Sequence, residues 1–577
     1  MRRIALSLLP LLVGDPVAGQ TMHVGVRPGG FRVRRMAGET GKVRRTSMRL
    51  GTSRSTCATV ADVRVSYWVV LAAIVLGVGC GEAGAHAPLR PAERAAASIL
   101  VMPDSVTFTS LGEAAQLTTQ VLDRDGQVIV GATLRWASHA PSVATVDSTG
   151  LVKATGNGTT TVTVTSGEAS GRAEVIVYDR RAAVSADRTV LLSFYHATGG
   201  SRWRSNENWD STRPLSEWAG VGTDEEGRVV ALELPLNRLG GRIPPEIGKL
   251  DRLKTLHLHR NRVTGPIPSE LGDLENLESL RLDHTGIEGT VPPELGQLTK
   301  LRTLNLFAAS LGGTLPSELG NLTSLTTLVL GDDGIEGPLP AWLWDLAGLE
   351  VVHIISNRMT GPLPPEIGQL VNLRELVIYD IPLRGTIPSS IGKLADLEVL
   401  SLVETDLTGS IPPEIGDLPN LTVLSLAANR LISEIPREVG RLRALINLEL
   451  YGNRLTGEIP AELGDLTNLQ RIFLSHNSVT GPIPPRLGNL RRLQQLSLGG
   501  NNLAGPVPPE LGNLGELIVL GLGWNSELTG PLPAGITRLS SLKWLYLHHT
   551  DLCVPEDSVF DAWLAQLDTF TGSRCSP

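Results

Sequence analysis

Leucine recurs in this chain every 24 residues, and this spacing is the strongest pattern in the sequence. Each repeat opens with two apolar residues separated by one variable position, as in Leu256 and Leu258, so both side chains point to one face of a short strand. No single repeat can bury that face alone, and the repeats must therefore stack into a solenoid. The first apolar positions are Leu232, Leu256, Leu280, Leu304, Leu328, Val352, Leu376, Leu400, Leu424, Leu448, Ile472, Leu496, Leu520 and, after a last step of 25 residues, Leu545.

The stacked pairs predict fourteen strands in one parallel sheet, with neighbouring strands about 4.8 Å apart and a total width of roughly 60 Å. An asparagine five positions after the first leucine is expected to hydrogen-bond backbone groups that are buried in the following turn. It is present at Asn261, Asn357, Asn429, Asn453, Asn477, Asn501 and Asn525, whereas central repeats have Thr285, Ala309, Asp333, Ile381 and Thr405 instead. This difference indicates a local change of shape or use.

The segments that link the strands are equally regular, as in LTGSIPPEIGDLPNL at 407–421 and LTGEIPAELGDLTNL at 455–469. This LxGxIPxxLGxL pattern extends over 229–552 and closely resembles the plant-type leucine-rich repeats of receptor kinases and secreted defence proteins. The resemblance implies a mainly β, right-handed leucine-rich-repeat solenoid with short helical or 3-10 segments and a concave face. Bacteria also carry such arrays, and neither a kinase nor a transmembrane helix follows the repeats in this sequence.

Caps are predicted at both ends of the array, at 179–228 and 553–577. A helix over 186–197, stopped by two glycines, would cover the first repeat, and Trp203, Trp209 and Trp218 after it are expected to fill the core of the cap. These tryptophans resemble the N-terminal cap of such arrays, without its usual cysteine pair. Cys553 and Cys575 flank a short predicted helix, and in an oxidising compartment a disulfide between them would hold the last repeat closed.

Residues 98–178 have a different pattern, in which short β-branched runs alternate with turns. The alternation in TVTVT and EVIVY predicts half-buried strands, and several such strands in about 80 residues indicate a β-sandwich. The segment resembles the bacterial Ig-like group 2 module through Trp136 and Ser138, Gly150-Leu151-Val152, and the glycines before TTTVTV. Trp136 is the expected core residue. An adhesive module and a spacer are both open interpretations.

The apolar run at 68–78, WVVLAAIVLGV, is too short to span a bilayer and has the length of the core of a signal peptide. It ends at Cys80 in a pattern that resembles a bacterial lipoprotein signal, in which the cysteine is lipidated; the leucine lies one place further from Cys80 than is usual. An ordinary cleaved signal and an uncleaved anchor are the alternatives. Residues 1–80 thus form a basic N-terminal region with a signal, and 81–97 form an Ala/Pro-rich linker.

The beginning of this N-terminal region allows two further interpretations. A start at Met48 would give a signal of normal length, so residues 1–47 would lie upstream of the true start. Alternatively, residues 4–13 could form a first, competing signal. N-terminal sequencing of the mature protein distinguishes these cases.

Composition and charge exclude several classes of function. Residues 1–64 carry 12 basic and 3 acidic residues, so the remainder has 51 − 12 = 39 basic and 59 − 3 = 56 acidic residues, a balance of −17. This acidic surface argues against nucleic-acid binding. No CxxC pair, nucleophile elbow, phosphate loop or HExxH motif is present, so neither an enzyme nor a cofactor is predicted.

The residues beside the inward leucines are expected to form the ligand-binding surface. They are polar at the start of the array, with His257, His259 and His284, and bare at its end, with Gly499, Gly521 and Gly523 followed by aromatic residues. The histidines lack a set of carboxylates, so no metal site is predicted. The middle of the array predicts an exposed apolar stripe that a ligand would cover, although strand propensity alone also explains such residues. The candidate ligand-binding residues are Phe307, Val329, His353, Ile355, Val377, Tyr379, Val403, Tyr451 and Phe473.

Together these features predict an exported, surface-tethered binding protein that recognises a protein, peptide or glycan with the concave face of its repeats. Its membrane contact would be a lipid anchor at Cys80 only. The alternative is a structural adhesin or envelope spacer in which the Ig-like module makes the contacts. The sequence gives neither the ligand nor the oligomeric state.

Overall fold

The computed structural model describes residues 95–576. The predicted signal segment, Cys80 and most of the linker lie outside these residues. In the part that is described, no helix is both long enough and apolar enough to cross a membrane.

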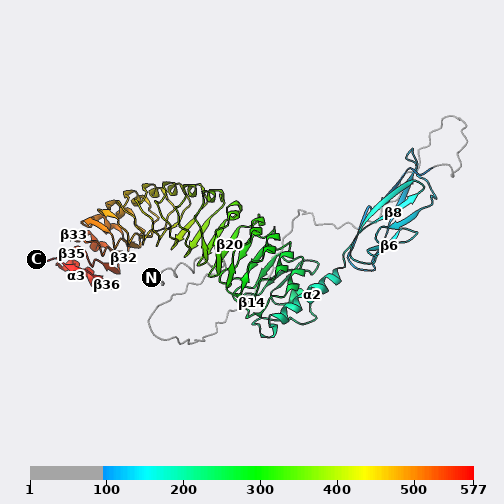
Figure 1. Cartoon of the computed structure of the whole chain (residues 1–577), viewed down its shortest axis with the longest axis horizontal. Helices are drawn as coiled ribbons and strands as arrows, with labels where there is room; N and C mark the ends of the chain where they lie inside the picture. The colour runs from blue at the N-terminus through cyan, green and yellow to red at the C-terminus, as the bar shows by residue number, and fades with distance from the viewer. Residues whose placement is uncertain (1–94, 577) are drawn as a thin grey trace, which may run out of the picture. The chain divides into compact units, whose positions relative to one another are not determined.

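An Ig-like module of nine short strands opens the described chain (Figure 1). The strands form sheets with the orders β1-β4, β2-β9-β8-β5 and β3-β7-β6. Alternate residues of β8 and β9 are buried, as the period-two pattern predicts. The strands are β1 (Ser98–Met102), β2 (Ser105–Phe108), β3 (Ala114–Gln116), β4 (Thr118–Leu122), β5 (Arg135–Ser138), β6 (Ala144–Val146), β7 (Leu151–Ala154), β8 (Gly158–Ser166) and β9 (Ala169–Val177).

Trp136 is the core residue that the sequence predicts for this module. Its partly buried ring packs against both apolar clusters of the module, one around Val162 and one around Val164. Gly150, at a φ of 85°, lies directly beneath this ring, and a Cβ there would come within 2.7 Å of Trp136 Cζ2. Glycine is therefore needed at this turn both for its backbone conformation and for the close approach of the indole.

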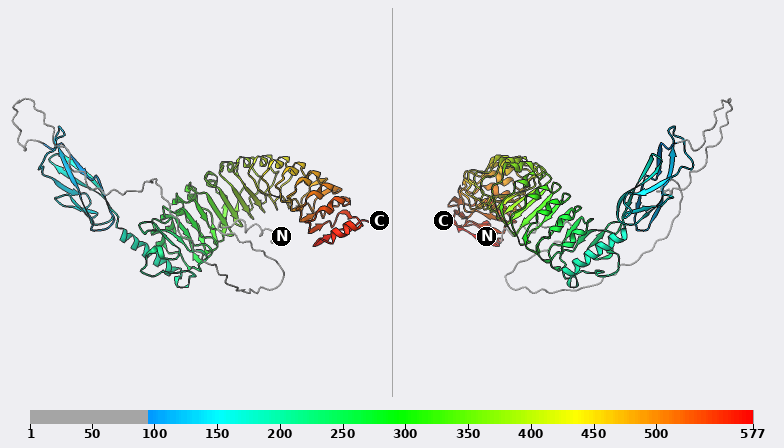
Figure 2. Two further views of the ribbon diagram at one scale, coloured as in Figure 1. Left: turned by 180° about the vertical axis from the view of Figure 1, so that it is seen from behind. Right: turned by 45° about the vertical axis from the view of Figure 1, so that its right-hand side comes forward.

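The predicted parallel sheet is present, and its fourteen repeat strands stand in register, with Leu232 beside Leu256 and Leu256 beside Leu280. Both ends carry one more strand, so the sheet has 16 strands; the first of them is antiparallel. The coils stack side by side in Figures 1 and 2. The strands are β10 (Val221–Thr223), β11 (Val229–Glu233), β13 (Thr255–His257), β15 (Ser279–Arg281), β18 (Thr303–Asn305), β20 (Thr327–Gly331), β22 (Val351–Ile355), β24 (Glu375–Tyr379), β25 (Val399–Val403), β26 (Val423–Ser425), β27 (Asn447–Glu449), β28 (Arg471–Phe473), β30 (Gln495–Ser497), β32 (Val519–Gly521), β34 (Trp544–Tyr546) and β36 (Thr569–Thr571).

Each coil closes through a 3-10 turn on the wall opposite the sheet, and most coils also carry a very short side strand. Each turn begins directly after a proline, such as Pro412 before η12. The extended backbone of this proline prevents the turn from extending toward the N-terminus. The turns are η5 (Pro245–Lys249), η6 (Ser269–Asp273), η7 (Pro293–Gln297), η8 (Ser317–Asn321), η9 (Ala341–Asp345), η10 (Pro365–Gln369), η11 (Ser389–Lys393), η12 (Pro413–Asp417), η13 (Arg437–Arg441), η14 (Ala461–Asp465), η15 (Pro485–Asn489), η16 (Pro509–Asn513) and η17 (Ala534–Arg538). The side strands are β12 (Gly240–Gly241), β14 (Arg262–Gly265), β16 (Gly286–Ile287), β17 (Gly289–Thr290), β19 (Leu311–Gly313), β21 (Gly334–Pro338), β23 (Arg358–Thr360), β29 (Thr480–Gly481), β31 (Asn502–Gly505), β33 (Glu527–Pro531), β35 (Asp551–Val554) and β37 (Ser573–Arg574).

All of the predicted turn asparagines except Asn357 form the hydrogen bonds expected of them, and Asn261 shows the pattern. Its Oδ1 accepts from the backbone N–H groups of Asn237 at 2.9 Å and Leu239 at 3.0 Å, while its Nδ2 donates to the carbonyls of Leu234 and Leu258. Each such asparagine therefore satisfies backbone groups of its own repeat and of the preceding one. Asn429 makes the same set of bonds, and Asn453, Asn477, Asn501 and Asn525 make most of it.

The N-terminal cap is built on helix α2 (Arg180–Ala197), which begins six residues earlier than the sequence predicts. Asp179 ends the preceding extended segment and caps the helix, because its carboxylate accepts from the backbone N–H groups of Arg181 and Ala182. Two short 3-10 turns follow, η3 (Gly200–Arg202) and η4 (Leu215–Glu217). Trp203, Trp209 and Trp218 are 6%, 6% and 2% exposed, which confirms that they fill the core of the cap.

A buried ion pair joins this helix to the first repeat. The guanidinium of Arg228 donates to both carboxylate oxygens of Asp187, at 2.9 and 3.1 Å, and also to Asp251 and to the hydroxyl of Tyr178. Asp187 in addition accepts from the backbone N–H of Val229. Asp187 and Arg228 are only 1% and 4% exposed, so each charge depends on the other for its compensation.

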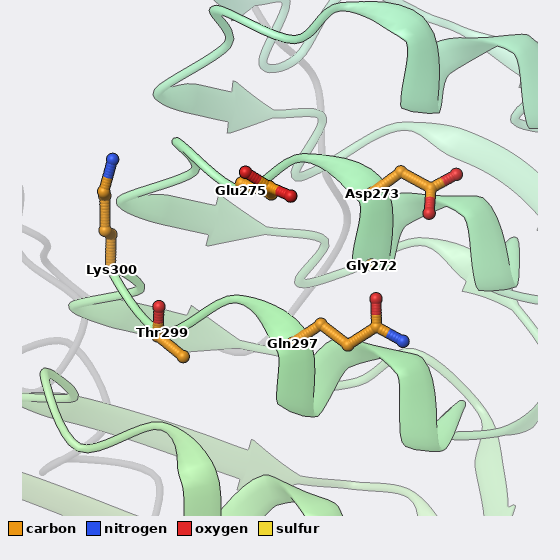
Figure 3. A pocket seen from close by; sticks show the side chains of 6 residues that line it. All are labelled: Gly272, Asp273, Glu275, Gln297, Thr299 and Lys300. Carbon is orange, nitrogen blue, oxygen red and sulfur yellow. The ribbon is translucent and has the colours of Figure 1, made fainter.

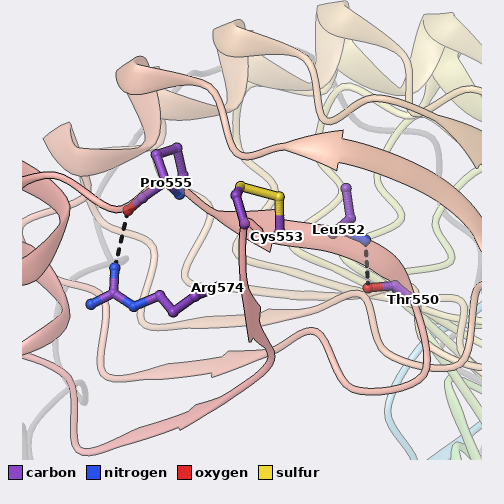
Figure 4. Close-up of a disulfide and its surroundings, with 6 residues drawn as sticks. Thr550, Leu552, Cys553, Pro555 and Arg574 are labelled. Carbon is purple, nitrogen blue, oxygen red and sulfur yellow. Dashed lines mark hydrogen bonds between the residues drawn. A yellow bond between two sulfur atoms is a disulfide. The ribbon is translucent and has the colours of Figure 1, made fainter. Parts of the chain in front are cut away.

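The C-terminal cap contains helix α3 (Ser558–Leu564) and a disulfide between Cys553 and Cys575 (Figure 4). The bond connects Cys553 on β35 to Cys575, which directly follows β37. Nearby, the guanidinium of Arg574 donates to the carbonyl of Pro555 at 3.0 Å and pairs with Asp561. The chain end is thus held on the last repeat by one covalent bond and several polar ones.

Replacing Cys553 with serine is expected to lower the free energy of unfolding of the C-terminal repeats by about 2–3 kcal/mol, because the disulfide closes a loop of 22 residues. Urea unfolding with and without a reductant measures this effect. The reductant should shift the transition of the natural chain and leave that of the variant in place. An unchanged transition of the natural chain under reducing conditions contradicts the expectation.

Candidate functional site

The strands of four central repeats are longer than those of most of their neighbours. Strands β20, β22, β24 and β25 each have five residues, whereas most repeat strands have three. Three of these four strands lie in repeats that lack the turn asparagine, and without its amide the backbone continues the ladder, with Ile355 beside Tyr379 and Tyr379 beside Val403. The lengthening accompanies the loss of the asparagine in these three repeats but does not follow from that loss alone, because β15 and β18 keep three residues although Thr285 and Ala309 stand at the same position.

The fourth of these repeats keeps its asparagine but not the bonds. Asn357, which is 7% exposed, is expected from the sequence to bond backbone groups, yet neither atom of its side-chain amide has a hydrogen-bond partner. The two carbonyls that the other asparagines bind correspond here to those of Leu330 and Ile354, and both residues lie within the paired strands β20 and β22. The longer strands thus take up the carbonyls that the side chain of Asn357 would otherwise bind.

Asp333 takes the place of an asparagine in the repeat of β20. Its Oδ1 accepts from the backbone N–H groups of Ala309 at 2.9 Å and Leu311 at 3.2 Å, and its Oδ2 accepts from that of Gly331 at 3.3 Å. Burial raises the pKa of Asp333 to about 6, although these N–H groups act in the opposite direction. The carboxylate therefore costs folding free energy at neutral pH, where it is ionised.

Replacing Asp333 with asparagine is expected to stabilise the chain by about 1 kcal/mol at pH 7.5. Because the folded-state pKa is raised, the natural residue contributes its stability below about pH 4 and loses it as pH rises through about 6. The amide avoids this loss, although it gives up the bond from Gly331. Denaturant unfolding of both chains at pH 4 and pH 7.5 tests this, and an equal difference at the two pH values contradicts it.

The concave face is defined here as the side of the main sheet that points away from the leucine core. The sequence predicts an exposed apolar stripe along its middle, and this prediction of exposure is wrong for most of the residues. Neighbouring bulky side chains on strands about 4.8 Å apart cover one another, so the stripe forms a thin second core. Phe307, His353, Ile355, Val377 and Val403 are 6%, 5%, 9%, 3% and 8% exposed, whereas Val329, Tyr379, Tyr451 and Phe473 are partly exposed.

Carboxylates that the sequence analysis did not select lie around this core. Glu375, on β24, accepts a hydrogen bond at 2.9 Å from Nε2 of the buried His353 on the adjacent strand. This bond lowers the pKa of Glu375, in spite of partial burial, which acts to raise it. The pair covers Val377 from one side and fixes a charged group at the edge of the core.

Tyr379 lies two residues after Val377, on the same face of β24. Its hydroxyl donates to the exposed carboxylate of Glu404 over a long distance of 3.4 Å. The pKa of Tyr379 is raised, first by burial and then by the charges of Glu404 and Asp380. Asp380 and Glu404 occupy the same turn position in successive repeats, at φ values of 53° and 56°, and both are exposed.

A second tyrosine, Tyr451, lies three repeats further along. The pKa of Tyr451 is raised by burial and then by Glu449 and Glu404, so Glu404 influences both tyrosines. Glu449 is 7% exposed and accepts from the hydroxyl of Ser425 at 2.9 Å, and burial raises its pKa. Two phenol rings and three carboxylates therefore share one surface.

We name these carboxylates the acidic band: Asp332, Glu375, Asp380, Glu404 and Glu449. The band lies within six successive repeats. No lysine or arginine occupies their strand and turn positions, which are 327–332, 351–356, 375–380, 399–404, 423–428 and 447–452. The band extends over five repeat steps, which is about 24 Å. Asp332, Asp380 and Glu404 are exposed, Glu375 is partly exposed and Glu449 is buried, and Arg471 on the next strand acts on Glu449.

The start of the array carries histidine and arginine side chains at these positions instead of an acidic band. His257 lies beside Ser279, with 2.8 Å between Nε2 and the hydroxyl, and burial lowers its pKa. Arg281 pairs with the buried carboxylate of Asp283 at 3.4 Å. Among the described residues, no group of three or more His, Cys, Asp or Glu side chains has an arrangement that could hold a metal ion.

One hollow on the outer wall is lined by Gly272, Asp273, Glu275, Gln297, Thr299 and Lys300. Figure 3 shows that these side chains extend from two neighbouring coils without converging on one point. The amine of Lys300 already donates to Asn276 Oδ1 at 2.6 Å. This surface is polar and gives no basis for a specific site.

Several segments of the chain match known families. Residues 95–177 match the bacterial Ig-like domain (group 2), and 230–331 match the leucine-rich repeat region. Residues 419–479 and 492–514 match two further leucine-rich repeat families. The chain therefore contains an Ig-like module followed by a leucine-rich-repeat solenoid, and none of the matched families is a catalytic one.

Receptors are among the proteins that this chain resembles. A probable inactive receptor kinase of Arabidopsis thaliana is 47% identical over 74 residues, which cover 13% of this chain and 11% of that protein. The structure of the plant peptide hormone receptor RGFR1 in complex with RGF2 is 31% identical, with a TM-score of 0.50, and 59% of this chain covers 61% of it. A TDR receptor structure is also 31% identical, with a TM-score of 0.53, and 57% of this chain covers 60% of it. The chain thus spans about three fifths of these receptor structures and a far smaller part of the curated relative.

Proposed function

We propose that this chain is an exported, surface-tethered binding protein that recognises a polypeptide segment with the concave face of its middle repeats. The observation that supports this most strongly is the acidic band beside Tyr379 and Tyr451. Carboxylates and phenol rings together suit the side chains of lysine and arginine, because a cation can pair with the first and lie over the second. The occupant in this proposal is therefore a segment of protein or peptide with basic side chains.

The dimensions of the band favour an extended segment that crosses the strands. An extended chain advances about 3.3 Å per residue, so about 24 Å accommodates roughly seven residues. The similarity to a receptor described as a peptide hormone receptor in complex with RGF2 supports a peptide ligand for this kind of surface. In this proposal Val329, Tyr379, Tyr451 and Phe473 contact the ligand, while Phe307, His353, Ile355, Val377 and Val403 support the surface from below.

The remaining parts of the chain have supporting roles in the proposal. Residues 1–80 direct export, Cys80 carries a lipid anchor, and 81–97 serve as a tether. The Ig-like module at 98–178 is a spacer between the membrane and the solenoid. Mass spectrometry of the membrane-associated protein tests the anchor, because a mature chain that begins at a lipidated Cys80 is expected. A mature chain that retains residues 1–47 contradicts it.

Selection from a library of random peptides displayed on phage tests the recognition itself. Peptides selected on the whole chain are expected to be enriched in lysine and arginine and to bind more weakly as salt increases. Enrichment in acidic residues, or the absence of any enriched sequence, contradicts the proposal.

A further inference from the structure

The last repeats of the solenoid carry an aromatic surface that the acidic band does not include. Trp524 is 57% exposed and Trp544 is 37% exposed, whereas most of the other tryptophans in the described part of the chain are buried. They come from adjacent repeats, on the turn after β32 and at the beginning of β34. We name the set of Trp524, Trp544, Tyr546, His548 and His549 the aromatic ledge.

The rings of the ledge follow the strand with the period that puts them on one face. Trp544, Tyr546 and His548 alternate along β34 and its extension, so all three point to the concave side. At the turn, His549 stacks on Trp524, with 3.7 Å between ring centroids and 28° between planes. His548 is held by a contact of 2.9 Å between its Nδ1 and the hydroxyl of Thr571.

The strand beside these rings is bare. The register places Val519 beside Trp544 and Gly521 beside Tyr546, and Gly523 follows as the neighbour of His548. A Cβ at Gly523 would come within 2.9 Å of the backbone oxygen of His548, so the two chains approach closely there. Gly521 and Gly523 are themselves buried, so Tyr546 and His548 face backbone rather than side chains on β32, whereas Val519 lies beside Trp544.

Trp524 also adopts an unfavourable backbone conformation. Its φ is 60°, in the left-handed region that bulky residues rarely adopt, and Gly452 and Gly500 occupy the same position in other repeats. An exposed indole at such a position adds neither core packing nor ease of folding. This turn position has a left-handed φ in most repeats, with Arg260, His284 and His476 among its other occupants, so the exposure of Trp524 is the feature that a bound ligand would explain.

The strand and turn positions of the ledge and of the two preceding repeats are uncharged, although Lys543 directly precedes Trp544. Residues 495–500, 519–524 and 544–549 contain no Lys, Arg, Asp or Glu, and only His548 and His549 can titrate. The hydrogen-bonding groups of the adjacent strands are amides and hydroxyls, with Gln495 and Ser497 on β30 and Thr569 and Thr571 on β36. This surface therefore does not match the charged occupant of the acidic band.

From these observations we infer that the aromatic ledge binds a neutral glycan. Sugar rings present an apolar C–H face that packs on indole and phenol rings, and hydroxyl edges that pair with amides and hydroxyls. The exposed indoles of Trp524 and Trp544 present the ring surface for such stacking, and the partly exposed Tyr546 lies on the same face of β34 as Trp544. This site is distinct from the proposed polypeptide site and does not depend on it.

Affinity electrophoresis of the whole chain in native gels tests the inference. The gels contain hydroxyethylcellulose, xyloglucan, galactomannan, soluble starch or dextran, with alginate as an anionic comparison. At least one neutral polysaccharide is expected to retard the natural chain, and Trp524→Ala and Trp544→Ala should each weaken that binding at least tenfold. Circular dichroism confirms that each variant is folded.

The control is Leu236→Ala, which removes an exposed apolar side chain from the same turn position at the other end of the array. Leu236 is 55% exposed at a φ of 54° and should not affect the binding. Three results overturn the inference: no neutral polysaccharide retards the chain, only alginate does, or the two tryptophan variants bind as well as the natural chain. Charge reversal in the acidic band should leave glycan binding unchanged, so the two sites fail separately.

Discussion

Replacing Arg228 with methionine is expected to lower the free energy of unfolding of the N-terminal end of the solenoid by about 3–5 kcal/mol. The substitution leaves the carboxylate of Asp187, only 1% exposed, without its guanidinium partner. A buried, uncompensated charge costs far more than a lost surface pair. Trp203, Trp209 and Trp218 lie in the same cap, so tryptophan fluorescence during denaturation follows this unfolding.

Two further variants isolate the cause of this loss. Arg252→Met removes a partly exposed guanidinium that lies 3.6 Å from the largely buried Asp224, and should cost less than about 1 kcal/mol. Combining Asp187→Asn with Arg228→Met removes both charges while an amide oxygen can still accept from Val229, so part of the stability should return. An equal loss for Arg228→Met and Arg252→Met would show that the buried pair has no special weight.

Reversing two charges of the acidic band, Asp380→Lys with Glu404→Lys, is expected to weaken the binding of a lysine-rich peptide at least 100-fold. The change removes two attractive carboxylates and brings like charges toward the ligand. Arg260 already occupies the same turn position in another repeat, at a φ of 55°, so a long basic side chain fits this backbone. Titration calorimetry with a peptide selected on the natural chain measures the effect.

The matched control moves the same charges to the outer wall. Glu275→Lys with Glu318→Lys gives the same change in net charge at two exposed positions on that wall. This control should lower the affinity less than threefold, because exposed charges more than about 10 Å apart are screened at physiological salt. Equal losses in both pairs would mean that net charge, rather than the acidic band, determines binding.

The fold is predictable from the sequence because one physical constraint repeats along the chain. Every repeat must place two leucines inward, and the register of Leu232, Leu256 and Leu280 follows directly from the constant step. The loss of the turn asparagine at Ile381 and Thr405 likewise predicts a local change, which is the lengthening of β24 and β25. Helix α2 is longer than predicted because its first turns lack the apolar period and depend on the cap at Asp179.

The candidate site is less predictable, because it depends on contacts between repeats. Val377 is buried beside His353 and Glu375, which come from two different strands. The residues at one position of each repeat, taken alone, do not reveal this arrangement. Asp380 and Glu404 each lie one position after the residues beside the inward leucines, which were the residues expected to form the ligand-binding surface. A signal was present in the sequence, since carboxylates recur at these turn positions while lysine and arginine are absent from the same strands.

Fluorine NMR of the whole chain labelled with 3-fluorotyrosine tests the central claim most directly. The chain has six tyrosines, and Tyr→Phe variants assign their resonances. On addition of a selected lysine-rich peptide, the resonances of Tyr379 and Tyr451 should shift together and saturate, while those of Tyr178, Tyr195 and Tyr546 stay in place. Saturable binding that leaves Tyr379 and Tyr451 unchanged, or that shifts one of the other three instead, would contradict recognition by the middle repeats.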